Sequence, residues 1–221
     1  MEWQLPIQKV EIGNINIGSP WSSRGLAQKP MAPLSYFGTQ FRLPFLSVLF
    51  PPLCVVEYVP ATGKLVLDMS ETSLASIKLN TLQDTLINAI MYHQMAWFKT
   101  DLAVEDVRQG FQPIIQDNKL ILHCPYTDMS LANPGKILFK NVPIYKNIAN
   151  KDDSIYKNIA NKDDIYKGGW GEFKPEDLAM GTRVRVAVKI HGISFLNRNE
   201  SSEWSGKCRL QHKVLGVIVQ A

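Results

Sequence analysis

The sequence is poor in cysteine: its 221 residues include only Cys54, Cys124 and Cys208. An odd number of widely spaced cysteines does not build the disulfide framework of a small secreted domain, so we expect buried free thiols in a reducing compartment. No apolar run approaches the roughly 18 residues of a membrane-spanning helix. Residues 1–4 lack the basic and apolar regions of a signal peptide. We therefore expect a soluble, intracellular protein with no membrane partner.

Catalytic motifs are also missing. The chain has no glycine-rich phosphate loop before a helix, no paired-carboxylate motif and no Gly-x-Ser-x-Gly elbow. The nearest metal set joins His123 and Cys124 with Cys208 and His212. The last two lie four residues apart on one strand, roughly 13 Å, and the first two point to opposite faces. We therefore expect no metal site and no enzymatic activity.

The clearest positive pattern lies near the C-terminus, where residues 182–190 and 207–214 alternate between apolar and polar side chains. A period of two places alternate residues on opposite faces of a strand, so two strands joined as a long hairpin are predicted. One face is apolar: Val184, Val186, Val188, Ile190, Cys208, Leu210 and Val214. The other face is mainly basic: Arg183, Arg185, Lys189, Lys207, Arg209 and Lys213.

The basic face has two interpretations. Outward Lys and Arg often do no more than keep a sheet edge soluble. Such faces usually mix both signs of charge, however, whereas residues 181–221 contain only two acids, Glu200 and Glu203. The net charge of the whole chain is only +4, so the placement of the charge matters more than its total. A strip of one sign favours a polyanionic ligand such as nucleic acid.

Three aromatic residues near this hairpin are candidates for stacking on bases. Trp204 lies in the polar segment between the two strands and is the best of them. Trp170 lies between glycines and is similar in kind, whereas Phe195 continues an apolar strand and belongs equally well to the core. Together with the six basic residues, these three form the predicted nucleic-acid-binding set.

The rest of the chain predicts a mixed fold. Residues 1–80 are rich in short apolar strands, including a hairpin over residues 54–69, and form an additional N-terminal β region packed on the main domain. Residues 81–221 form the main domain, with a helix over residues 81–100, a short helix near 104–108 and a strand over 119–124. The predicted class is α+β, a β-rich OB-like barrel with one or two helices.

A tandem repeat interrupts the main domain. Residues 144–154 are followed by nearly the same residues at 155–164, and a third copy begins at 165–167. Two short copies are too few for a solenoid, so residues 144–167 are predicted to be a duplicated loop insertion. Lengthening a loop costs little entropy, and we assign this insertion no function.

An ordered set of short motifs resembles the single-stranded-DNA-binding proteins of large nucleocytoplasmic DNA viruses. The set spans roughly residues 82–219 and contains Trp97-Phe98, Phe111-Gln112-Pro113-Ile114, Pro175-Glu176-Asp177-Leu178, Gly181, Gly192-Ile193-Ser194-Phe195 and Arg209-Leu210-Gln211. Two positions depart from the family pattern: Ser194 replaces an aromatic residue and Cys208 replaces a tryptophan. Either loss would weaken stacking or move it to Trp204.

The resemblance implies an OB-like fold, no cofactor and sequence-independent binding of single-stranded DNA in viral replication, recombination or repair. It also implies replication proteins as partners and a host-cell replication site in the cytoplasm or nucleus. Two alternatives stay open: a structural or assembly protein of a virion, which the apolar N-terminal strands would suit, and an RNA-binding OB domain. The N-terminal region is either an added sheet or a contact in a homo-oligomer.

Overall fold

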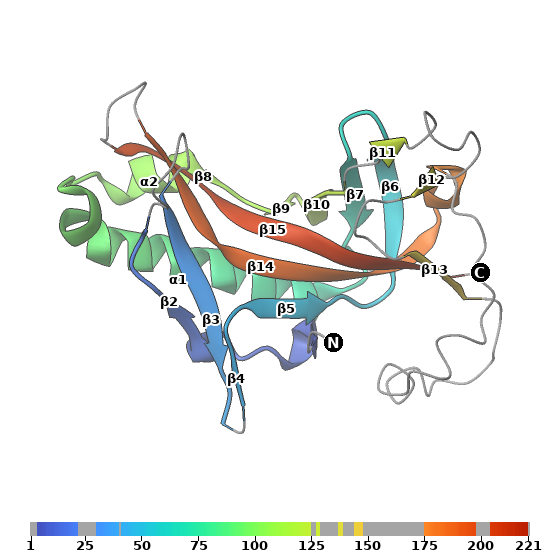
Figure 1. The fold of residues 1–221 in the computed structure, drawn as a ribbon, viewed down its shortest axis with the longest axis horizontal. Helices are drawn as coiled ribbons and strands as arrows, with labels where there is room; N and C mark the ends of the chain where they lie inside the picture. The colour runs from blue at the N-terminus through green and yellow to red at the C-terminus, as the bar shows by residue number, and fades with distance from the viewer. Residues whose placement is uncertain are drawn as a thin grey trace.

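The computed structural model describes residues 4–21, 30–39, 41–124, 127–128, 137–138, 144–147, 175–197 and 204–220. Their fold is mixed α+β: one large sheet, a long helix and a short helix (Figure 1). The sheet is open, so the expected OB-like barrel is not confirmed. Neither of the two α-helices is both long and apolar enough to cross a membrane.

The sheet is organised around two long antiparallel strands, β14 (Arg183–Asn197) and β15 (Trp204–Gln220). They form the predicted hairpin. Its first run is rich in valine, which favours strands because branched side chains pack well on a pleated surface. β-Bulges next to Ala187 and Ile190 insert extra residues into the ladder. The apolar side chains nevertheless stay on one face of the hairpin and the basic side chains on the other.

Three N-terminal strands pair in succession with the other edge of β14. They are β3 (Met31–Phe37), β5 (Leu46–Leu49) and β6 (Leu53–Val59). The region expected at residues 1–80 therefore continues the same sheet as the C-terminal hairpin.

The sheet then curves through β7 (Lys64–Asp68), β10 (Lys119–His123) and β9 (Ile115–Gln116). The predicted hairpin near residues 54–69 and the predicted strand near 119–124 are confirmed as β6–β7 and β10. The remaining short elements are β1 (Leu5–Pro6), η1 (Ile7–Lys9), η2 (Ile12–Asn14), β2 (Ile15–Ile17), β4 (Arg42–Leu43), β8 (Phe111–Gln112), β11 (Thr127–Asp128), β12 (Ile137–Leu138), β13 (Ile144–Asn147) and η3 (Pro175–Leu178).

Of the predicted insertion at residues 144–167, only β13 lies within the described residues. It pairs in parallel with the end of β15.

Helix α1 (Ser73–Phe98) covers one face of the sheet, and α2 (Val104–Gly110) follows it near β15. The buried side of α1 includes Leu79, Leu82, Leu86 and Ile90. The predicted start at residue 81 is wrong, because the first two turns expose Leu74 and Ile77 and so hide the usual amphipathic pattern. The helix ends at Lys99, whose left-handed φ of 55° stops it.

The pairing of β3 with β14 can be tested at Gly192. A Cβ built there would collide with the carbonyl group of Ala32, so Gly192→Ala should lower the free energy of unfolding by about 1–3 kcal/mol. Gly13→Ala is the control, because a Cβ at Gly13 meets no atom within 4 Å. Urea unfolding of both variants measures the difference. Equal stabilities would contradict the close approach of β3 to β14.

Candidate nucleic-acid interface

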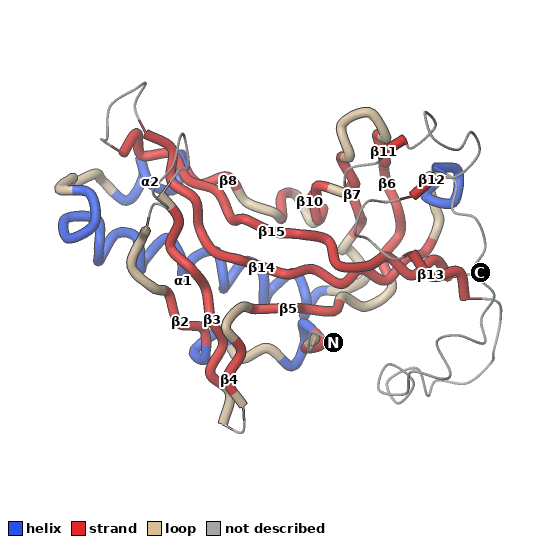
Figure 2. Tube along the Cα trace, viewed as in Figure 1, coloured by secondary structure: helices blue, strands red, loops and turns tan. Residues whose placement is uncertain are grey.

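The predicted basic residues lie on the face of β14–β15 that points away from α1. The apolar row, which includes Val186, Val188 and Ile190, is fully buried. The register pairs Val188 with Val214 on that side, and Lys189 directly with Lys213 on the other. Figure 2 shows α1 behind these strands and their opposite face toward the viewer. We call this opposite face, across β3, β4, β5, β14 and β15, the basic face.

The basic face carries charge of one sign. The strands β3, β4, β5, β14 and β15 contain no aspartate or glutamate. They contain seven basic residues: Arg42, Arg183, Arg185, Lys189, Lys207, Arg209 and Lys213. Lys189 and Lys213 are direct cross-strand partners, so the ladder itself brings two lysines side by side on this face.

Aromatic rings lie beneath two of these cations. Lys189 Nζ lies 3.2 Å from the ring centroid of Phe45, and Arg42 Cζ lies 5.3 Å from that of Phe37. A cation over a ring face is attracted by the negative charge of the π system. The rings therefore hold the cations in place without neutralising their charge, as a carboxylate would.

Arg209 is oriented by neutral groups. With its amide oxygen turned toward Arg209, Gln211 accepts hydrogen bonds from Arg209 Nε at 2.9 Å and from Ser194 Oγ at 2.7 Å. Ser194 is the cross-strand partner of Arg209. These contacts fix the guanidinium and preserve its full charge, which suits contact with a phosphate.

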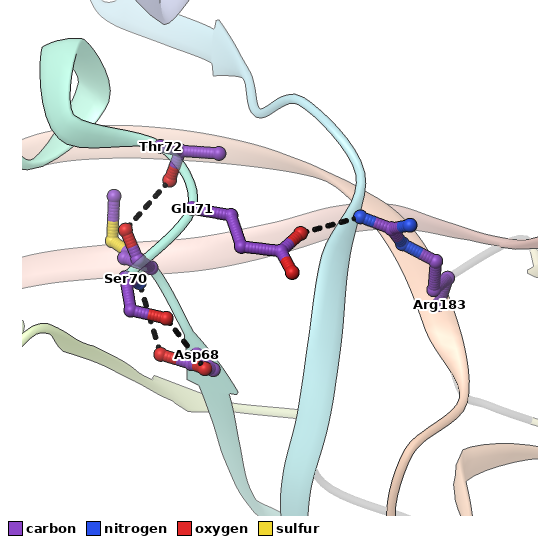
Figure 3. Close-up of polar contacts among 6 residues, drawn as sticks. Asp68, Ser70, Glu71, Thr72 and Arg183 are labelled. Carbon is purple, nitrogen blue, oxygen red and sulfur yellow. Dashed lines mark hydrogen bonds and ion pairs between the residues drawn. The ribbon is translucent and has the colours of Figure 1, made fainter.

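Arg183 forms an ion pair with an acidic residue. Its Nη2 lies 2.7 Å from Oε2 of Glu71, in the turn before α1 (Figure 3). In the same turn Asp68 accepts hydrogen bonds from the backbone N–H and the hydroxyl of Ser70. Both partners of the ion pair are exposed, so it adds little stability. A phosphate would have to compete with Glu71 for Arg183, so Arg183 is a weak candidate for phosphate binding.

Two of the predicted stacking residues, Phe195 and Trp204, lie in the core and present no ring surface to solvent. Their exposed fractions are 0% and 1%. Trp204 is the first residue of β15 rather than part of the turn, and it lies on the inward side with Cys208. Its ring centroid is 4.9 Å from that of Phe98, and its indole N–H donates to the Lys207 carbonyl at 2.9 Å. Trp170 lies outside the described residues.

The cysteines are free thiols. Cys124 and Cys208 are buried, and burial raises the pKa of each to about 12, so both stay protonated near neutral pH. Cys54 is only half-buried, contrary to the expectation that all three are buried. The part of the chain that the structure describes has no group of three His, Cys, Asp or Glu residues that could hold a metal ion.

His123 and His212, which the sequence analysis considered and dismissed as metal ligands, are joined by a hydrogen bond. The backbone N–H of His123, at the end of β10, donates to Nε2 of His212 on β15 at 3.0 Å. Nδ1 of His212 lies 3.4 Å from the Leu210 carbonyl, which fixes the neutral tautomer with its proton on Nδ1. Protonation of Nε2 would place its N–H against the backbone N–H of His123, so that two hydrogen-bond donors would face each other. This contact therefore requires neutral His212.

The environment of His212 favours that neutral form. Burial lowers its pKa, and the neighbouring charges of His123, Arg209 and His191 lower it further, although the Leu210 carbonyl acts in the opposite direction. The folded pKa therefore lies below the value of about 6.5 expected in the unfolded chain.

The resulting pH dependence can be measured. Because the folded pKa of His212 is depressed, its contribution to stability is complete above about pH 6.5 and is lost as pH falls through the folded pKa. In urea titrations from about pH 7.5 to 5, the unfolding free energy of the wild type should fall more steeply than that of His212→Gln, whose amide does not titrate. Parallel curves for the two proteins would show that His212 titrates alike in both states.

Comparison of the chain with protein-family models, curated proteins and solved structures finds no match. The resemblance to viral single-stranded-DNA-binding proteins therefore rests on the sequence motifs alone and stays a prediction.

Proposed function

We propose that this protein binds single-stranded nucleic acid, DNA in the first place, along its basic face. The observation that carries the proposal is the direct pairing of Lys189 with Lys213 within five strands that contain no acid. Phosphates would be attracted to the paired lysines, and release of counterions would drive binding.

The layout of the basic face argues against a helix that reads a duplex sequence, and the preference for a single strand is supported by the motif resemblance. Reading a duplex sequence requires an element that enters a groove, whereas α1 lies on the opposite side of the sheet (Figure 2). Lysine and arginine contacts to phosphates position a strand without reading its bases. An RNA ligand is the alternative, because the same contacts would hold either backbone.

The wider role proposed is coating of single strands in viral DNA replication, recombination or repair. This role is supported by the motif resemblance. The same resemblance is the basis for proposing a relation to the OB fold, replication proteins as partners and a location at the replication site of the host cell. The curved part of the sheet, where β10 approaches β15, is the part that would correspond to such a barrel.

Binding should depend on the paired lysines. We expect Lys189→Ala/Lys213→Ala to weaken binding to a labelled dT strand, and to reduce the slope of log affinity against log salt by about 1.4, because each single-strand phosphate contact contributes about 0.7. Lys9→Ala/Lys119→Ala removes the same charge from exposed positions outside the five strands and should change the slope little.

Fluorescence anisotropy with dT, a matching duplex and an RNA of equal length, across a salt series, measures these affinities. Tighter binding to dT than to RNA would favour the DNA role, and the reverse would favour the RNA role. No binding at low salt by the wild type, or equal losses in both double variants, would contradict the proposal.

Assembly into a larger structure is a second candidate function, favoured by the solvent side of α1. This 26-residue helix has only two charged side chains other than histidine, and both are engaged: Lys78 donates to the Val10 carbonyl and Asp84 pairs with Arg108. Its exposed apolar residues are Leu74, Ile77, Tyr92 and Met95. Such a face can pack on the same face of a second copy without repulsion between like charges.

The size of the face limits the expected strength of such a contact. A helix of this length is about 39 Å long and about 10 Å wide, so it offers on the order of 400 Å² per copy. Stable interfaces bury about 800 Å² per partner. We therefore expect weak, concentration-dependent dimers by light scattering, and monomers for Ile77→Glu/Met95→Glu. A wild type that is monomeric at every concentration would exclude assembly through α1.

A further inference from the structure

The hairpin formed by β3 and β4 presents two phenylalanines of nearly equal exposure in different surroundings. The exposed fractions of Phe37 and Phe41 are 44% and 42%. Phe41 stacks on Tyr36, with ring centroids 5.9 Å apart and planes at 25°. Phe37 instead pairs across the hairpin with Arg42, whose guanidinium lies over its ring. Figure 1 shows this hairpin projecting beyond the edge of the sheet.

The strand register places Phe37 on the basic face. Ala32, Leu34 and Tyr36 alternate along β3 and are buried in the core, so Phe37 points to the opposite side. Met31, which shares the side of Phe37, pairs with Ser194. Ser194 in turn pairs with Arg209 on β15. Phe37 and Arg209 therefore belong to the same face.

Cations and rings continue from the centre of the basic face to this hairpin. Lys213 is paired with Lys189, and Lys189 lies over Phe45. Phe45 lies just after β4 in the chain, and Arg42 of β4 lies over Phe37. Because these strands contain no acid, a negatively charged backbone would meet no repulsion from them along this path.

We propose that the Arg42–Phe37 pair stacks an unpaired base and thereby makes the basic face selective for single strands; this rests on the function proposed above. The guanidinium group is planar, so it can lie between the phenylalanine ring and a base. Stacking of one base on such a platform strengthens binding by roughly 5- to 100-fold. The base faces of a duplex are covered by their neighbours, so a duplex gains nothing from the pair.

The test compares the two phenylalanines of the hairpin. Phe37→Ala should weaken binding to labelled dT by roughly 5- to 100-fold and leave duplex binding within about twofold, so that the preference for single strands collapses. Phe41→Ala, at equal exposure on the other side of the hairpin, should change neither affinity. Tyr92→Ala, an aromatic residue 84% exposed on α1, is a second control.

Two further variants separate stacking from folding. Phe37→Leu keeps an apolar side chain at the position and should bind as poorly as Phe37→Ala. Phe37→Trp keeps an aromatic ring and should bind about as tightly as the wild type. A dT strand carrying 2-aminopurine reports stacking directly, because its fluorescence is quenched when the base stacks. Quenching by the wild type should be lost in Phe37→Leu.

The outcomes distinguish this inference from the proposed function. Wild-type binding that weakens in Lys189→Ala/Lys213→Ala but is the same in Phe37→Ala and Phe37→Leu would overturn the stacking role and leave the proposed function standing. Equal wild-type affinities for dT and duplex would also overturn it. A wild type that binds no nucleic acid at low salt would overturn both.

Discussion

The antiparallel ladder between β14 and β15 is the constraint on which the rest of the structure depends. It directs the valines toward α1 and the lysines and arginines away from it, and a slip of one residue would exchange the two sets. Three N-terminal strands attach to the free edge of β14, so their positions follow from the same register. Burial of the apolar row thus fixes where the basic face lies.

The sequence predicted the hairpin because strict alternation of apolar and polar residues is typical of a half-buried strand and does not fit the period of a helix. The predicted position of Trp204 was wrong, because its polar neighbours indicated a turn and the structure places it in β15. Trp204 lies four residues before the inward-facing Cys208, and this even spacing was consistent with a buried side chain. The attachment of the N-terminal strands to β14 could not be predicted, because no local pattern specifies which distant edge a short strand will join. The start of α1 was missed because Leu74 and Ile77 face solvent.

Sequence reasoning looked for stacking residues next to the basic strands, and the structure brings in others from far along the chain. Phe37, Arg42 and Phe45 lie in the N-terminal third, yet the sheet places them on the face of Lys189 and Arg209. A weak signal was present: no acid occurs between residues 30 and 56. These strands contain no carboxylate, and aromatic rings contact both Lys189 and Arg42.

The contact between His123 and His212 has a consequence for how the molecule opens. Within the described residues, β10 has no backbone ladder with β15, and the two are joined by a hydrogen bond from a backbone amide to an imidazole. Breaking that bond costs a net of about 1 kcal/mol, far less than separating the strands of the central ladder. The amide hydrogen of His123 should therefore exchange with solvent through local opening, long before those that join β14 to β15.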